Sequence, residues 1–252
     1  DDDVVVKSKL KGSKDVPFPK HGLTLKEILK FIEKNGGKER FKDMTTTQVC
    51  DEVLKVATKD HQCSYCELLL LEDTDSDGDA SISNHHQRSI GIDYVANVQR
   101  KESTKDGSVG KAEVFVSHAW KYKFLDVVSA LEYHFKDTPD IIIWFDLFSN
   151  NQHGTGELPF EWWATTFKSA IQEMGRTVMV LAPWRDPIPF TRAWCLFEVY
   201  STVITKSKFE VAMSKSERKK FLEEICSDGG SFYKMLGDVD VRKSEAWNPV
   251  DK

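Results

Sequence analysis

The chain has 252 residues, of which 40% are hydrophobic and 30% are charged, and its formal net charge is −5. This composition fits a folded globular protein and excludes a collagen-like or wholly disordered chain. The negative charge argues against a nucleic-acid binder that relies on bulk positive charge. No apolar run approaches the roughly 20 residues of a membrane-spanning helix, so we expect no membrane insertion.

The cysteine pattern indicates the compartment. Five cysteines occur at irregular spacing, and the acidic start of the chain shows no signal peptide. An odd number of cysteines argues against a secreted disulfide framework. We therefore expect a reduced, cytoplasmic protein.

The N-terminal part predicts a tail, a small helical unit and a linker. Residues 1–20 show no lasting periodicity, which is typical of a tail or an extended arm. Thr24 and Glu27 have the spacing of a capping box, and apolar residues at helical spacing follow, so residues 21–72 are expected to form the helical unit. Residues 73–110 are acidic and then polar, which predicts a linker or an insertion.

From residue 111 to residue 252 the pattern predicts an α/β domain. The expected buried strands are residues 114–116, 141–145, 178–181 and 209–212. Helical periodicity separates these runs, and a fifth strand is expected near Val239–Val241. Ser214 and Glu217 have the spacing of a second capping box and predict a helix start. Continuous apolar strands that alternate with helices predict a parallel sheet covered on both faces. We therefore predict a flavodoxin-like three-layer sandwich around five parallel strands.

Polar and aromatic side chains follow the expected strands. In an open parallel sheet, ligands bind at the carboxyl ends of the strands, near the point where the strand order reverses. The residues concerned are Ser117, His118 and Trp120 after the first strand, Asp146 and Phe148 after the second, and Trp184 after the third. The polar segment from Asp146 to Pro159 contains two glycines and could move as a lid.

Glu198 is the most unusual residue of the predicted helices. It interrupts the apolar segment Ala193–Tyr200 and shares a helical face with Trp194. A carboxylate in such a place must be paired or must lie at a cavity. Desolvation beside an indole would raise its pKa.

Four features, in this order, resemble a Toll/interleukin-1 receptor (TIR) domain. They are Val114–His118 for the first strand and its terminal serine, Trp144–Asp146 for the second strand before the BB loop, Val178–Leu181 for the third strand, and Trp194–Glu198 for the Trp-Cys-Leu-x-Glu signature. The resemblance covers roughly residues 112–213 and at most extends to residue 247. The sequence departs from the family pattern at His118–Trp120 and in a longer BB loop.

The resemblance implies an NAD+ glycohydrolase of signalling or innate defence, with Glu198 as the catalytic residue. It implies that Glu198 stabilises an oxocarbenium-like transition state while the nicotinamide–ribose bond breaks, with hydrolysis or cyclisation of ADP-ribose as alternatives. NAD+ is the substrate, no cofactor is required, and self-association of the domain completes the site. The expected contacts to NAD+ are Ser117, His118, Trp120, Asp146, Phe148, Trp184, Arg192 and Trp194.

Within that set, different roles are expected. Ser117 and Asp146 could orient the ribose or the nicotinamide, and Trp120, Phe148 or Trp184 could stack on a ring. Arg192 or Lys121 could contact the pyrophosphate. The roles of His118 and Trp194 are open, because a loop histidine need not act in proton transfer and a tryptophan in an apolar helix usually packs in a core.

Two other functions remain alternatives. In a catalytically inert TIR scaffold, Glu198 would be a structural carboxylate paired with Arg192 or another cation, and the domain would mediate homotypic contacts. A related enzyme could act on a smaller nucleoside. The end of the chain at Asp251-Lys252, shortly after the expected last strand, also fits a fragment of a longer protein.

Metal sites are considered at two places, and we expect none. Cys50, His61, Cys63 and Cys66 have a spacing that could hold zinc, but buried cysteines are the alternative. The acidic segment 73–84 resembles a calcium loop, but Asn84 replaces the glutamate of its last position. A solvated acidic loop, or at best weak calcium binding, is therefore expected there.

Overall fold

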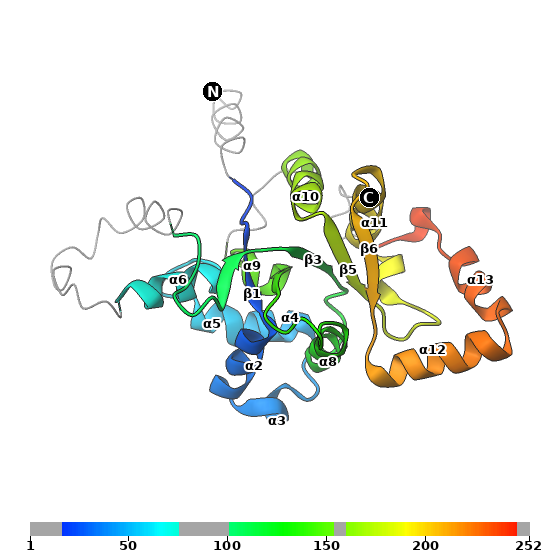
Figure 1. The fold of residues 1–252 in the computed structure, drawn as a ribbon, viewed down its shortest axis with the longest axis horizontal. Helices are drawn as coiled ribbons and strands as arrows, with labels where there is room; N and C mark the ends of the chain where they lie inside the picture. The colour runs from blue at the N-terminus through cyan, green and yellow to red at the C-terminus, as the bar shows by residue number, and fades with distance from the viewer. Residues whose placement is uncertain (1–16, 76–100, 154–159, 246–252) are drawn as a thin grey trace, which may run out of the picture.

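The computed structural model describes residues 17–75, 101–153 and 160–245, and Figure 1 shows how they are arranged. At the centre is a six-stranded mixed sheet with the strand order β2-β1-β4-β3-β5-β6. Helices contact both faces of the sheet, so the protein has an α/β fold. Within these three segments, no helix combines the length and the apolarity that a membrane crossing requires.

Four neighbouring strands of this sheet are parallel, as predicted from their apolar runs. They are β4 (Ile142–Phe145), β3 (Val114–Ser117), β5 (Arg176–Val180) and β6 (Lys208–Ala212). Val116 pairs with Phe145 on one side and with Val178 on the other. These three residues are buried, which explains why the inner strands lack an alternation of polar and apolar residues.

The other two strands correct the predicted sheet. β1 (His21–Thr24) pairs antiparallel with β4, and β2 (Val109–Lys111) pairs antiparallel with β1. The prediction of five parallel strands is therefore wrong, because such short strands carry too few side chains to show a periodicity. Gly22 permits the pairing, since a Cβ atom at this position would collide with the carbonyl oxygen of Ile143.

The first N-terminal helix begins where the capping pattern predicted. α2 (Leu25–Lys34) starts after Thr24, whose Oγ1 accepts a 3.3 Å hydrogen bond from the Glu27 amide. The elements that follow are α3 (Gly37–Phe41), α4 (Thr46–Val49), a π-helical turn (Cys50–Leu54), α5 (Lys55–Ala57) and α6 (Tyr65–Asp75).

These helices share one core with the sheet. Phe31 of α2 packs edge-on against Phe148, with 5.1 Å between the ring centroids, and both belong to the cluster that includes Val116 and Val178. Residues 21–72, which were predicted as a separate helical unit, thus pack on the same sheet as the α/β region. Apolar periodicity identifies a helix but not the surface on which the helix packs.

The two faces of the sheet carry different helices. On the first face lie α2, α6, α8 (Phe124–His134) and α9 (Asp146–Ser149). On the second lie α10 (Phe160–Met174) and α11 (Ala193–Ile204). Val114 and Val116 join the core of the first face, whereas Phe115 joins Phe167 of α10 on the second. Successive side chains of a strand point to opposite faces of the sheet, so Ser117, two residues after Phe115, lies on the second face.

The C-terminal region differs from its prediction. α12 (Lys215–Ser227) begins at the predicted cap Ser214, and Figure 1 shows α12 and α13 (Gly230–Gly237) extending beyond the β6 edge of the sheet. The expected strand near Val239–Val241 is absent, and a 3₁₀ turn forms at Val241–Lys243. Asp240 favours the turn because its carboxylate accepts a 3.1 Å hydrogen bond from the Arg242 amide.

Candidate active site

The candidate site lies where the order of the parallel strands reverses. After β3 the chain forms β4 on one side of β3, and it later returns to form β5 on the other side. The loops that leave the carboxyl ends of β3 and β5 therefore diverge, and such a point is where ligands bind in open α/β sheets. Ser117 is the last residue of β3 and is 1% exposed.

Ser117 and Glu198 form the central contact of this site. The Ser117 hydroxyl donates a 2.5 Å hydrogen bond to Oε2 of Glu198, which is partly buried on α11. α11 is held on β5 by a 2.9 Å hydrogen bond from Thr202 Oγ1 to Thr177 Oγ1. The structure thus joins two of the predicted site residues that are 81 positions apart in the chain.

The surroundings of Glu198 favour its protonated form. Burial raises the pKa of Glu198 to about 8, with a further contribution from the negative charge of Asp146, although the Ser117 hydrogen bond opposes the shift. Among the described residues, no cation makes an ion pair with Glu198. Arg192, the partner expected for a purely structural carboxylate, lies 3.4 Å from Glu245 instead.

Arg192 and Lys121 meet at one carboxylate near the start of α11. Lys121 Nζ lies 2.8 Å from Glu245 Oε2, the same oxygen that faces Arg192. The backbone of Glu245 also accepts a 2.9 Å hydrogen bond from the Ala193 amide. The two cations proposed for a pyrophosphate are therefore adjacent. Glu245 itself was missed by sequence reasoning, because nothing in its local pattern distinguishes it from other surface glutamates.

A second cluster joins the ends of β3 and β4. Trp120 Nε1 donates a 2.6 Å hydrogen bond to Asp146 Oδ2, and the Leu147 amide donates one of 2.8 Å to Oδ1. The His118 ring is buried, and its Nδ1 lies 3.6 Å from Asp146 Oδ1. Three predicted site residues, His118, Trp120 and Asp146, are thus brought together beside Glu198.

Burial controls the protonation of this cluster. It lowers the pKa of His118, although the charge of Asp146 opposes the shift. It raises the pKa of Asp146, although His118 and Trp120 favour the carboxylate. His118 is therefore neutral at pH 7, and its Nε2 has no hydrogen-bond partner within the described part of the chain. The neutral His118 ring therefore packs beside Asp146 and adds no positive charge to the cluster.

Three aromatic residues of the predicted site pack against protein. Phe148 is fully buried among core rings, which corrects its expected role in stacking on a ligand. Trp184 is 2% exposed and packs edge-on against Phe221 of α12 at 5.2 Å, so it is also not presented to a ligand. Trp194 lies between Phe167 and Phe197 and remains partly exposed.

The segment after β4 begins with a helix and not with the expected loop. α9 occupies Asp146–Ser149, and its Phe148 and Ser149 are buried. Ser149 Oγ accepts a 3.2 Å hydrogen bond from the Phe145 amide, which fixes this turn to the strand. Residues 154–159, with both glycines of the expected lid, lie outside the described residues.

The cysteines of the suggested zinc site are separate buried thiols. Burial raises the pKa of Cys50 and of Cys63 to about 12, and it also raises the pKa of Cys66. No cluster of three or more histidine, cysteine or acidic residues that could hold a metal occurs within residues 17–75, 101–153 and 160–245. Most of the calcium-loop candidate lies outside these residues, and its Asp73 pairs with Lys101 at 2.5 Å.

Comparisons with protein-family models, with curated proteins and with solved structures find no match for the chain.

Proposed function

We propose that the protein is a TIR-type NAD+ glycohydrolase, with Glu198 as its catalytic residue. The observation that carries this proposal is the carboxyl of Glu198, held by Ser117 at the switch point of the sheet without an ion-pair partner among the described residues. The four parallel strands lie side by side in the order β4, β3, β5, β6. Counted by their order in the chain, this is second, first, third, fourth. This order is that of a flavodoxin-like fold and supports the resemblance to a TIR domain.

The chemistry proposed for Glu198 is electrostatic. Cleavage breaks the bond between C1′ of the ribose and N1 of nicotinamide, and the electron pair stays on N1, so nicotinamide leaves neutral. Positive charge develops on C1′ and the ring oxygen, and a carboxylate beside them stabilises it. Water then adds to C1′ and loses a proton, or a nucleophile within ADP-ribose closes a ring.

The raised pKa of Glu198 fits a cationic substrate. The pyridinium of NAD+ placed beside the carboxyl favours the ionised form and lowers the pKa on binding. Substrate binding then releases the proton of Glu198 and generates the carboxylate where it is needed. Asp146, anchored by Trp120, is the candidate for binding ribose hydroxyls, and the neighbouring Arg192 and Lys121 are the candidates for the pyrophosphate.

The test is nicotinamide release from NAD+ at high protein concentration, followed by chromatography. Wild type is compared with Glu198→Ala and Glu198→Gln, and with Glu223→Gln on exposed α12 as a matched control. We expect a loss on the order of 10²–10³-fold at position 198 and none at position 223. Equal release by wild type and Glu198→Ala would overturn the assignment. Parallel reactions with free nucleosides test the smaller-substrate alternative.

An interaction module without turnover is the second candidate, and one surface favours it. α11 and the edge strand β6 expose large apolar side chains, namely Tyr200, Val203, Ile204, Phe209 and Val211. Such a surface favours association with a second copy of the domain. Under this function, no NAD+ turnover is seen even in crowded solution, and Val203→Lys lowers the sedimentation coefficient to that of a monomer.

A further inference from the structure

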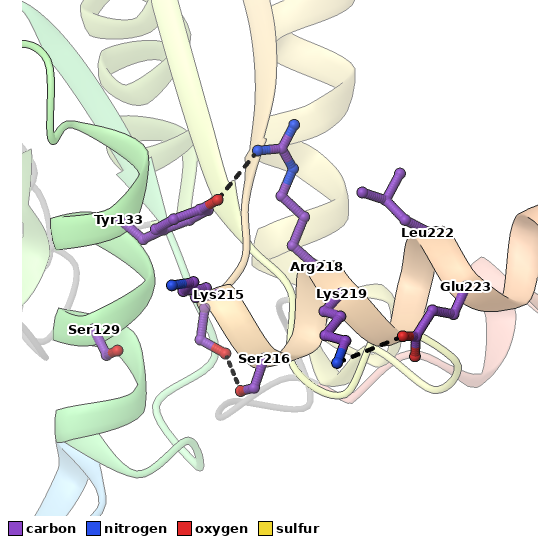
Figure 2. A pocket seen from close by; sticks show the side chains of 9 residues that line it. Ser129, Tyr133, Lys215, Ser216, Arg218, Lys219, Leu222 and Glu223 are labelled. Carbon is purple, nitrogen blue, oxygen red and sulfur yellow. Dashed lines mark hydrogen bonds and ion pairs between the residues drawn. The ribbon is translucent and has the colours of Figure 1, made fainter.

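A cleft of about 680 Å³ lies between α8 and α12, on the face of the sheet opposite to α11. Figure 2 shows its two walls, with Ser129 and Tyr133 on α8 and the basic side chains on α12. The residues lining it are Ser129, Tyr133, Ser214, Lys215, Ser216, Arg218, Lys219, Leu222 and Glu223. This volume is in the range of sites for small molecules.

The charge of the cleft is mainly positive. Three cations, Lys215, Arg218 and Lys219, line the cleft together with one carboxylate, Glu223, which lies 3.7 Å from Lys219. Within the described part of the chain, Lys215 and Arg218 make no ion pair. The cleft therefore holds two cations without a carboxylate partner among the described residues, although the net charge of the protein is −5. They create a local positive potential that attracts anions.

Hydrogen bonds position the polar side chains that line the cleft. Arg218 Nη1 donates a 3.4 Å hydrogen bond to the Tyr133 hydroxyl, which holds the guanidinium across the cleft from α12 to α8. The hydroxyls of Ser214 and Ser216 lie 3.0 Å apart. Ser214 already caps α12 by accepting a hydrogen bond from the Glu217 amide. The attraction therefore comes from the side chains of the cleft and not from the end of the helix.

We propose that this cleft binds a small phosphorylated compound. A guanidinium matches phosphate geometry with two parallel N–H donors, an ammonium adds a point charge, and serine hydroxyls satisfy further phosphate oxygens. Tyr133 and Leu222 supply apolar surface for the organic part of the ligand. The concave shape between two helices favours a compact ligand over an extended acidic peptide. This site is separate from Glu198 and does not depend on the proposed reaction.

Inorganic pyrophosphate is the probe, and isothermal titration calorimetry of the intact chain is the measurement. We expect saturable binding that weakens as sodium chloride rises from 50 to 300 mM. Arg218→Gln should weaken binding about tenfold or more, since it removes charge-assisted hydrogen bonds. Lys215→Gln, an independent exposed variant, should weaken it less. Circular dichroism confirms that both variants are folded.

Three control variants make the assignment specific. Lys220→Gln removes a charge from the same helix outside the cleft and should change affinity less than twofold. Glu198→Gln, at the other site, should also leave binding unchanged. Arg192→Gln removes any pyrophosphate contact at that other site and should leave the binding that depends on Arg218 unchanged. Absence of saturable binding, an equal loss in Lys220→Gln, or a loss in Arg192→Gln in place of Arg218→Gln would each overturn the proposal. Binding of an acidic peptide without binding of pyrophosphate would overturn it as well.

Discussion

Glu198 and Glu210 lie on opposite faces of the same sheet, and their carboxyls meet opposite surroundings. Glu210 on β6 faces Arg176 Nη2 and His134 Nε2, each at 2.8 Å, and also Lys208. Burial opposes its ionisation, but the hydrogen bonds from these three residues outweigh burial and lower the pKa to about 2. Glu198 has a hydroxyl partner in Ser117 and a pKa of about 8.

The difference separates a structural carboxylate from one available for chemistry. Glu210 connects β5, β6 and the end of α8, so its charge is already used within the fold. Glu198 is partly buried with a neutral donor, so an arriving cation would be its first strong electrostatic partner. A buried carboxyl without a cation is unfavourable for stability unless it stays protonated, and such groups gather at functional sites.

The largest effect is expected in the pH dependence of NAD+ cleavage. If the carboxylate of Glu198 is the active form, kcat/KM reports its pKa in the free protein and rises about tenfold per pH unit towards a plateau above pH 8. The pyridinium lowers this pKa in the complex, so kcat should level off at a lower pH. Initial rates between pH 5.5 and 9 measure both profiles. A kcat/KM that falls with pH would make protonated Glu198 the active form.

The next effect concerns stability at pH 7. Glu210→Ala leaves Arg176 and His134 without their acceptor, and we expect a loss of about 2–3 kcal/mol, below the range for fully buried pairs because the site is partly exposed. Glu198→Gln breaks no ion pair and removes the cost of keeping this carboxyl protonated, so it should raise the free energy of unfolding at pH 7 and not lower it. Urea unfolding of both variants gives the two free energies. Equal losses of unfolding free energy in the two variants would contradict the view that Glu210 is structural and Glu198 is available for chemistry.

The two carboxyls should also give opposite slopes of stability against pH. The lowered pKa of Glu210 makes its contribution full above its unfolded pKa of 4.5, and the contribution is lost as pH falls through about 2. The raised pKa of Glu198 makes its contribution full below 4.5, and this contribution is lost as pH rises towards about 8. Urea midpoints across pH 2–9 measure both slopes. Glu198→Gln should remove only the slope between pH 4.5 and 8.

The smallest effect is expected for Ser117→Ala. The hydroxyl favours the carboxylate of Glu198, so its loss should raise the pKa of Glu198 further and shift the kcat/KM profile to higher pH. Thr202→Val is a control that changes another hydroxyl on the inner face of α11. It removes the hydrogen bonds to Thr177 and to the backbone oxygen of Glu198 but leaves the side-chain contact between Ser117 and Glu198, so the profile should keep its position. A downward shift in Ser117→Ala would contradict the assigned role.

Much of the sheet and the central residue of the site could be predicted from the sequence. Three apolar runs became β3, β4 and β5, because strands buried on both faces require consecutive apolar residues, and the fourth run became the exposed edge strand β6. The carboxylate in an apolar helix identified Glu198, because a charge in such a segment is unfavourable without a special reason. The capping patterns at Thr24 and Ser214 located two helix starts, since these bonds are made within one turn.

Tertiary structure decided everything that depends on distant partners. β1 and β2 become strands only because β4 and β1 offer backbone hydrogen bonds. The two segments have four and three residues that mix polar residues, glycine and apolar residues, so they show neither an apolar run nor a period. Phe148 and Trp184 follow strands as a ligand-stacking residue would, but the helices packed against them bury both. Whether Arg192 neutralises Glu198 or Glu245 depends on chain folding across many residues, and that choice sets the charge of the site.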